Sequence, residues 1–283
     1  MGTKLKECRD LVLIFSVFNP LSIHEQIGKS KQNIIPLAAP TAAKAWNQVE
    51  CDPTTNRIVS LRMYSGNLSG EIPAEVGDLP YLKTLELHKL TNITGPIPTS
   101  ISNLINLISL RLSRLNLTGP KLIFLAWTGT SLRAQFPESF GNFVGRVPGI
   151  SLSHNQLSGK IPASLDNRDF RWVDFSRNKL EGDASMFFGP NKTTGVVDLS
   201  RNLLEFNFSN VVFPTTLTNL DINHNKIFGS IPTQMTQLTI LSLNVSYNRL
   251  CGLIPQGGKL PSLDYTAYFH NKCLCGTPLE SCK

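Results

Sequence analysis

Three aspartates recur at nearly equal spacing in the second half of the sequence. Asp174, Asp198 and Asp221 are separated by 24 and 23 residues. If each ends a strand of one sheet, the carboxylates lie one strand spacing apart, about 4.8 Å, near the separation used by retaining glycosidases. A general acid needs a pocket that raises its pKa, and an open sheet offers none. We therefore expect no catalytic residues.

The remaining candidates for chemistry are also weak. The sequence has no nucleophile elbow, metalloprotease helix or phosphate loop. His154 and His224 occupy equivalent positions three repeats apart, roughly 14 Å by strand spacing, which is too far to share a metal. "CLC" followed by a lone Cys282 is not the ligand spacing of zinc. We expect no enzymatic activity, no metal and no cofactor.

One phrase, LxLxxNxLxGxIP, dominates the chain and explains the spacing. Its asparagines, separated by 23, 24, 23 and 23 residues, are Asn155, Asn178, Asn202, Asn225 and Asn248. A period of this length indicates leucine-rich repeats. In LxLxx the leucines point inward and the other residues outward, so stacked coils form one parallel sheet. Each asparagine is interpreted as structural, because a buried amide side chain can bond the coils above and below. The glycine and proline suit the tight, extended return of the chain.

Several longer stretches resemble the polygalacturonase-inhibiting proteins of plants. They are "EIPAEVGDLPYLKTLELHKLTNITGPIP", "SRNKLEGDASMFFGPNKTT", "DLSRNLLEFNFSNVVFP" and "YNRLCGLIPQGGKLPSLDYTAYFHNKCLCGTPLESCK", and the resemblance runs from about Trp46 to Lys283. It implies a right-handed solenoid with one short parallel strand per coil on a concave sheet, and irregular, extended or 3-10 segments on the convex side. It also implies a secreted cell-wall protein that binds fungal or insect endopolygalacturonase, and disulfides Cys251–Cys273 and Cys275–Cys282.

The resemblance divides the chain into unequal parts. Residues 1–45 form an atypical N-terminal segment, in which "LVLIFSVF" is a short apolar run behind Glu7, Arg9 and Asp10, so a signal peptide is left open. Residues 46–57 are the remnant of a cap, because Gln48 stands where the family has a cysteine. Residues 58–250 are the repeats and 251–283 the disulfide-bonded C-terminal cap. Cys8 and Cys51 are left over, and their pairing stays open.

The repeats are irregular near residues 120–134. From Gly119 to Ala134, interpreted as the next equivalent position, the interval is only 15 residues, whereas neighbouring intervals run 23 to 25. A coil cannot close in 15 residues. We expect a shortened, irregular coil that exposes or misplaces Trp127.

Function must reside on the outward-facing strand positions, because the fold alone does not assign it. These positions form an acidic column and a basic or aromatic column, with Trp172 and Tyr247 as amphipathic anchors. Opposite charges on a solvated sheet can also simply neutralise one another. The candidate partner-binding residues are Arg62, Tyr64, Glu86, His88, Arg111, His154, Trp172, Asp174, Arg177, Asp198, Arg201, Asp221, His224 and Tyr247.

Composition and sequons complete the expectations. A net charge of +7 favours an acidic partner, including pectin (homogalacturonan), but no nucleic-acid module accompanies it. No window is long enough to span a membrane, and we expect a monomer. The glycosylation sequons are at Asn67, Asn92, Asn116, Asn191, Asn207 and Asn244; a glycan on Asn244 would crowd the concave face. A receptor-like recognition module, ice binding and a decayed paralogue without inhibitory activity remain alternatives.

Overall fold

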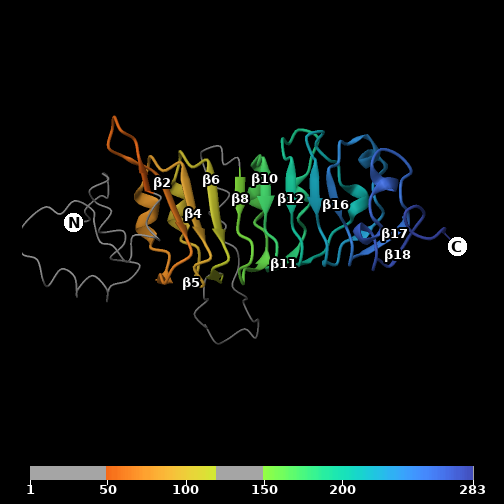
Figure 1. Ribbon diagram of the computed structural model, residues 1–283, viewed down its shortest axis with the longest axis horizontal. Coiled ribbons are helices and arrows are strands. Elements are labelled where there is room, and N and C mark those ends of the chain that lie inside the picture. The colour runs from red at the N-terminus through yellow and green to blue at the C-terminus, as the bar shows by residue number, and fades with distance from the viewer. Residues whose placement is uncertain (1–48, 119–148, 283) are drawn as a thin grey trace, which may run out of the picture.

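The computed structural model describes residues 49–118 and 149–282 as an arc of stacked coils (Figure 1). One strand from each coil joins a nine-stranded sheet in the order β1-β2-β4-β6-β8-β10-β12-β14-β16. All neighbours are parallel except β1 and β2. The strands are β1 (Val49–Cys51), β2 (Ile58–Tyr64), β4 (Thr84–His88), β6 (Ser109–Ser113), β8 (Gly149–Ser151), β10 (Trp172–Asp174), β12 (Val196–Asp198), β14 (Asn219–Asp221) and β16 (Ser242–Asn244).

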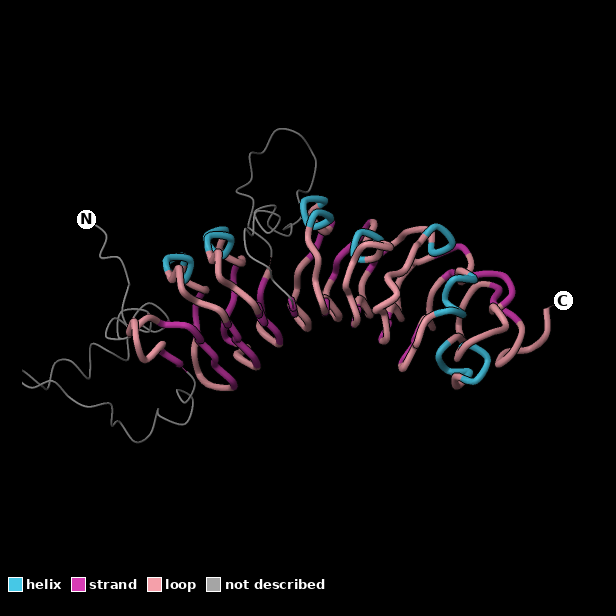
Figure 2. Tube along the Cα trace, turned by 90° about the horizontal axis from the view of Figure 1, so that it is seen from above, coloured by secondary structure: helices cyan, strands magenta, loops and turns pink. Residues whose placement is uncertain are grey.

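Most of the short 3-10 helices line the outer side of the arc, opposite this sheet (Figure 2), whereas η10 (Tyr265–Ala267) lies beside β16 at the C-terminal end of the sheet. In four coils the proline of the repeat directly precedes the helix, at Pro73, Pro98, Pro162 and Pro232. Proline fixes φ and donates no hydrogen bond, so it ends the extended run and starts the turn. The helices are η2 (Ala74–Asp78), η3 (Thr99–Asn103), η5 (Ala163–Asn167), η6 (Ser185–Phe187), η7 (Phe208–Asn210), η8 (Thr233–Gln237), η9 (Leu260–Ser262) and η10 (Tyr265–Ala267).

Most coils also carry a second short strand, which the sequence analysis did not predict. It follows the asparagine position and in most coils contains the repeat glycine, as at Gly159 (φ 80°) and Gly182 (φ 79°). Glycine adopts such left-handed angles without strain, which explains its place in the template. The strands form three small sheets: β3 (Ser69–Glu71), β5 (Asn92–Gly95) and β7 (Asn116–Leu117); β9 (Ser158–Lys160), β11 (Lys179–Gly182) and β13 (Leu203–Leu204); β15 (Phe228–Gly229), β17 (Arg249–Leu253) and β18 (Cys273–Cys275).

The core is the stack of inward-facing repeat positions. Leu61, Leu85, Leu110 and Ile150 follow one another in strand register and are fully buried. Farther along, aromatic side chains widen the stack, and the rings of Phe208 and Phe213 lie 5.5 Å apart. The leucine-rich-repeat class predicted from the sequence is therefore confirmed.

The structure shows how the repeat asparagines join the coils. Asn202 donates from Nδ2 to the carbonyl oxygens of Phe175 (3.0 Å) and Leu199 (3.1 Å), and its Oδ1 accepts from the Leu180 amide (3.0 Å). The side chain thus joins its own coil to the preceding one rather than to the coils on both sides. Asn271 in the C-terminal cap makes the same bonds, to Val245 and Leu250.

The sheet is continuous where the sequence analysis expected a shortened coil. Leu110 pairs with Ile150, so 40 residues separate equivalent positions, against 23 between Ile150 and Val173. A backbone hydrogen bond also links the two coils next to the second strands, from the Gln156 amide to the Leu117 carbonyl (2.9 Å). The expected shortened coil falls within residues 119–148, which connect these two coils. Residues 120–134, with Trp127, lie outside the described residues.

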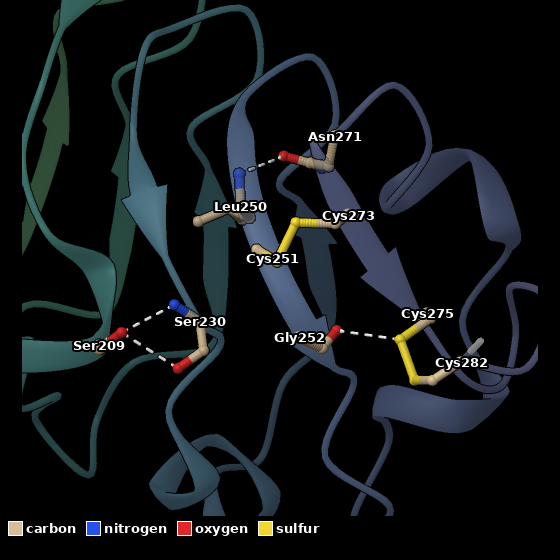
Figure 3. The surroundings of a disulfide bond; sticks show 9 residues. All are labelled: Ser209, Ser230, Leu250, Cys251, Gly252, Asn271, Cys273, Cys275 and Cys282. Atoms are coloured by element: carbon tan, nitrogen blue, oxygen red, sulfur yellow. Dashed lines mark hydrogen bonds between the residues drawn. A yellow bond between two sulfur atoms is a disulfide. The ribbon is translucent and has the colours of Figure 1, made fainter.

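The C-terminal cap extends the stack by one partial coil (Figure 3). The disulfide Cys251–Cys273 joins β17 to β18, and Cys275–Cys282 holds the last residues against β18. The buried Tyr268 hydroxyl donates to the Leu260 carbonyl (2.9 Å).

At the other end Cys51 is also disulfide-bonded, whereas Cys8 and the rest of the expected segment 1–45 lie outside the described residues. No helix in residues 49–118 and 149–282 is long and apolar enough to cross a bilayer.

Candidate functional site: the concave face

The strand register brings the predicted residues together in columns on the concave sheet. The first, here called the central column, runs along the middle of the sheet. It contains Arg62, Glu86, Arg111, Ser151, Asp174, Asp198, Asp221 and Asn244. The second, the turn column, holds one residue from the turn that follows each strand. It contains Ser65, Lys89, Arg114, His154, Arg177, Arg201, His224, Tyr247 and His270.

Every residue of the turn column adopts a left-handed backbone. Their φ angles lie between 53° and 59°, a region that side-chain-bearing residues rarely adopt. The backbone amide of a turn-column residue donates to a carbonyl of the next coil, as from Arg177 to Ser200 (2.8 Å). Such strain costs on the order of 1 kcal/mol per residue and persists where the surroundings impose it. The coils therefore place these nine side chains in one row.

The aspartates of the central column help to impose that turn. Asp174 Oδ1 accepts from the amide (3.1 Å) and hydroxyl (2.7 Å) of Ser176, and Asp198 accepts from the Ser200 amide (3.0 Å). An aspartate that bonds the amide two residues ahead stabilises a turn. These carboxylates are consequently part of the scaffold as well as part of the surface.

The surroundings of two central-column carboxylates, Asp198 and Asp221, disfavour their charged form. Burial raises the pKa of Asp198 and of Asp221, and the neighbouring carboxylate raises each further. Hydrogen bonds from Ser200 act on the pKa of Asp198 in the opposite direction but do not cancel the effect. Among the described residues no group of three His, Cys, Asp or Glu side chains is arranged to hold a metal ion.

At the N-terminal end of the concave face the charges satisfy one another. Arg62 forms an ion pair with Glu50 (2.7 Å) and lies 4.0 Å from Glu86, which also accepts from the Tyr64 hydroxyl. Burial, followed by Glu86, raises the pKa of Tyr64. His88 is engaged too, through Nδ1 and the Ser113 hydroxyl (2.8 Å). Mutual neutralisation of charge therefore explains these residues better than partner binding does.

The middle of the face has unpaired cations. Arg111, Arg177 and Arg201 are exposed, and none forms an ion pair with another described residue. Arg114 and Arg177 lower the pKa of His154, after burial, which is the larger cause. The Nδ1 atom of His154 is buried without a hydrogen-bond partner among the described residues. This region therefore presents free positive charge beside the aspartates.

The C-terminal end of the turn column is an aromatic stack. The rings of His224 and Tyr247 lie 4.0 Å apart and nearly parallel, and His270 stacks on the other side of Tyr247 at 4.4 Å. Phe269 packs edge-on against Tyr247 at 5.1 Å. Burial, then Arg201, lowers the pKa of His224. Tyr247 remains 39% exposed, so the stack offers a flat apolar surface with polar edges.

Trp172, predicted as an anchor, has a partly structural role. A Cβ atom on Gly149 would lie 1.9 Å from Trp172 Nε1, so the indole ring covers Gly149 on the neighbouring strand. Its remaining surface is only partly exposed. A glycine at position 149 is thus what allows this tryptophan to lie against the sheet.

Sequence reasoning missed part of the turn column. His270 and Phe269 belong to the aromatic stack, and Lys89 and Arg114 occupy the same column in earlier coils. A signal was present for His270, because it lies 23 residues after Tyr247 and precedes an asparagine in "YFHN". Lys89 and Arg114 lacked that signal, since leucines 90 and 115 replace the asparagine.

Comparisons with known proteins agree with this geometry. A family model for the Leucine Rich Repeat matches residues 149–167 and 216–238. The chain is 56% identical over 271 residues to a polygalacturonase inhibitor of Pyrus communis (84% of this chain, 82% of that protein). It is 50% identical to a polygalacturonase inhibitor of Vitis vinifera (91% and 88%). The crystal structure of a plant ice-binding protein is 40% identical, with a TM-score of 0.59 (84% and 88%).

Proposed function

Because this chain belongs to the polygalacturonase-inhibitor family, we propose that it binds a fungal or insect endopolygalacturonase through its concave face and blocks the substrate cleft without catalysis. The relatives in pear and grapevine carry the name of this activity. Their similarity extends over most of the chain, which supports transferring the role.

The observation that carries the proposal is the continuity of the concave sheet across β6 and β8. It places Arg111 on a strand adjacent to Ser151, so the free charge of Arg111 continues into that of the later coils. Arg177, Arg201 and the His224–Tyr247–His270 stack then follow on successive rungs. Interface hot spots are enriched in arginine and tyrosine. The surface therefore combines charge for orientation with an aromatic anchor.

The mechanism we propose is steric. An arc of coils that meets the rim of a cleft prevents a polymer from entering, and no group on this face needs to react. Free arginines would orient acidic groups of the enzyme, whereas the self-paired Arg62–Glu50–Glu86 cluster would contribute little, because its charges are already satisfied.

Secretion, a monomeric state and pectin binding are further parts of the proposal. All five described cysteines are disulfide-bonded, and Cys251 and Cys273 are exposed to solvent. Exposed disulfides suit an oxidising compartment. The free arginines would also attract homogalacturonan. A salt-sensitive pull-down on that polymer tests the last point.

The test is inhibition of reducing-sugar release by a panel of fungal endopolygalacturonases, using the full chain secreted from plant cells. We expect Arg201→Glu to weaken inhibition by about 10-fold or more, the loss of a 1.4 kcal/mol contact. Lys179→Glu reverses an exposed charge on β11, outside the concave sheet, and should change nothing. A folded, secreted protein that leaves every enzyme active would sink the proposal and favour receptor-like recognition or loss of function.

A further inference from the structure

The six sequons differ in where they lie on the solenoid. All six asparagines belong to the described residues, and five of them lie outside the nine-stranded concave sheet. Asn244 lies within it, as the last residue of β16 and the next member of the central column after Asp221.

The side chain of Asn244 is held with its amide nitrogen free. Oδ1 accepts from the amide (3.1 Å) and hydroxyl (2.7 Å) of Ser246, the bonding that Asp174 makes with Ser176. Nδ2 donates to no other described residue, and the side chain is only half-buried. Nδ2 is the atom to which an N-linked glycan attaches. The scaffold therefore uses the oxygen and leaves the reactive nitrogen available.

The two register neighbours of Asn244 have short side chains. Asp221 lies on one side in strand register. On the other side the Val245 amide donates to the Ala267 carbonyl (2.8 Å), as the Phe175 amide does to Asp198, so Ala267 takes the next register position. Its methyl group is the smallest side chain that could stand there apart from glycine. No long side chain therefore stands beside Asn244 at either neighbouring register position.

We propose that Asn244 is N-glycosylated and that its glycan covers the C-terminal end of the concave face, limiting contact with Asp221, His224 and Tyr247. Transfer from a polyisoprenyl-pyrophosphate-linked oligosaccharide forms the bond between Nδ2 and C1 of the first sugar. It breaks that sugar's bond to pyrophosphate, which leaves with the electron pair, and the amide proton is released. Tyr247 is three residues further on, at the turn after the strand, so its Cα lies at most about 10 Å away, within reach of a glycan core.

The consequence for inhibition rests on the proposed function, but the modification does not. An unglycosylated form would present the whole aromatic stack, whereas a glycosylated form would present mainly Arg111, Arg177 and Arg201. Occupancy of one sequon would therefore set how much of the concave face a partner can reach.

The experiment uses the full chain secreted from plant cells. Peptide mapping after enzymatic deglycosylation, which converts the modified asparagine to aspartate, reports occupancy. Asn244→Asp removes the site and retains the acceptor for Ser246, and Asn244→Gln removes it without adding charge. The matched control is Asn207→Asp, since Asn207 Oδ1 also accepts from the amide two residues ahead (Ser209, 3.0 Å) but lies off the concave sheet.

We expect an occupied Asn244, several-fold faster nitration of Tyr247 by tetranitromethane in both Asn244 variants, and about 10-fold stronger inhibition by them. Asn207→Asp should match the wild-type protein. An unmodified Asn244, or an occupied one whose removal changes neither nitration nor inhibition, overturns the inference. If nitration rises but no variant inhibits any enzyme, the glycan inference stands and the proposed inhibitory function fails.

Discussion

Replacing Asn202 by alanine tests how the asparagine ladder holds the concave face in place. The side chain makes four bonds, and it is 6% exposed. Three of them go to carbonyls that keep another donor: Asn178 also bonds Phe175, Asn225 also bonds Leu199, and the Arg177 amide also bonds Ser200. The fourth goes from the Leu180 amide, which loses its partner.

The expected loss of stability depends mainly on the Leu180 amide, because the three carbonyls keep another donor. An orphaned buried amide costs about 1–3 kcal/mol, and the lost bonds to already bonded carbonyls add about 1 kcal/mol. We expect Asn202→Ala to lower the free energy of unfolding by about 2–4 kcal/mol. Asn103→Ala, in the exposed part of η3, should stay within about 0.5 kcal/mol of wild type.

Asn202→Asp tests the hydrogen-bond acceptor of the side chain separately from its donor, because only the donor is removed. It retains an oxygen for Leu180 but points a second oxygen at three carbonyls, so the pKa of the new carboxyl group should be raised. For an acid with a raised folded pKa, the cost is present above that pKa and disappears as the pH falls towards the unfolded value of about 3.9. Urea unfolding at pH 7 and pH 4, each relative to wild type, measures it. A cost below about 1 kcal/mol for Asn202→Ala, or an Asp cost that is equal at both pH values, would refute the reasoning.

Three further perturbations follow from the structure. Asp198→Asn should raise the Tm at pH 7, because it removes a buried charge and retains the acceptor for Ser200. Since the pKa of Asp198 is raised, this gain in Tm should vanish as the pH falls below that pKa towards 3.8. Asp183→Asn, at an exposed carboxylate that accepts from Ser185, should leave the Tm unchanged. Gly149→Ala should displace the Trp172 indole and change its fluorescence relative to a Trp172→Phe background, and an unchanged spectrum would contradict the packing. Removing Cys251–Cys273, which closes 22 residues, should cost about 3 kcal/mol in urea unfolding, and removing Cys275–Cys282, which closes 7, about 2 kcal/mol; the reverse order would contradict a loop-entropy origin.

Much of the fold was predictable because the repeat is a local pattern. Alternation in LxLxx decides which side chains face the core, and it needs no knowledge of distant residues. The core leucines and the outward position of Asp198 and Asn244 follow from that alternation alone, whereas Arg201 and Tyr247 face outward because of the left-handed turn after the strand. The second strand was not predicted, because the LxGx segment that forms it is too short to show a period.

The candidate site was predictable as a set of positions but not as a set of interactions. Asp198 and Arg62 look equivalent in a strand pattern, yet one helps to form a turn and the other is neutralised by Glu50. Glu50 lies on β1, which is antiparallel and outside the repeat, so its meeting with Arg62 depends on a pairing that no period encodes.

The sequence by itself determined the class of solenoid, the inward and outward faces of each coil and the spacing of the asparagines, because each depends on residues a few positions apart. The tertiary structure alone decided that β6 pairs with β8 across residues 119–148 and that Lys89 and Arg114 belong to the turn column. Both depend on hydrogen bonds between coils, and such bonds select the partner that completes the stack rather than the nearest similar phrase in the chain.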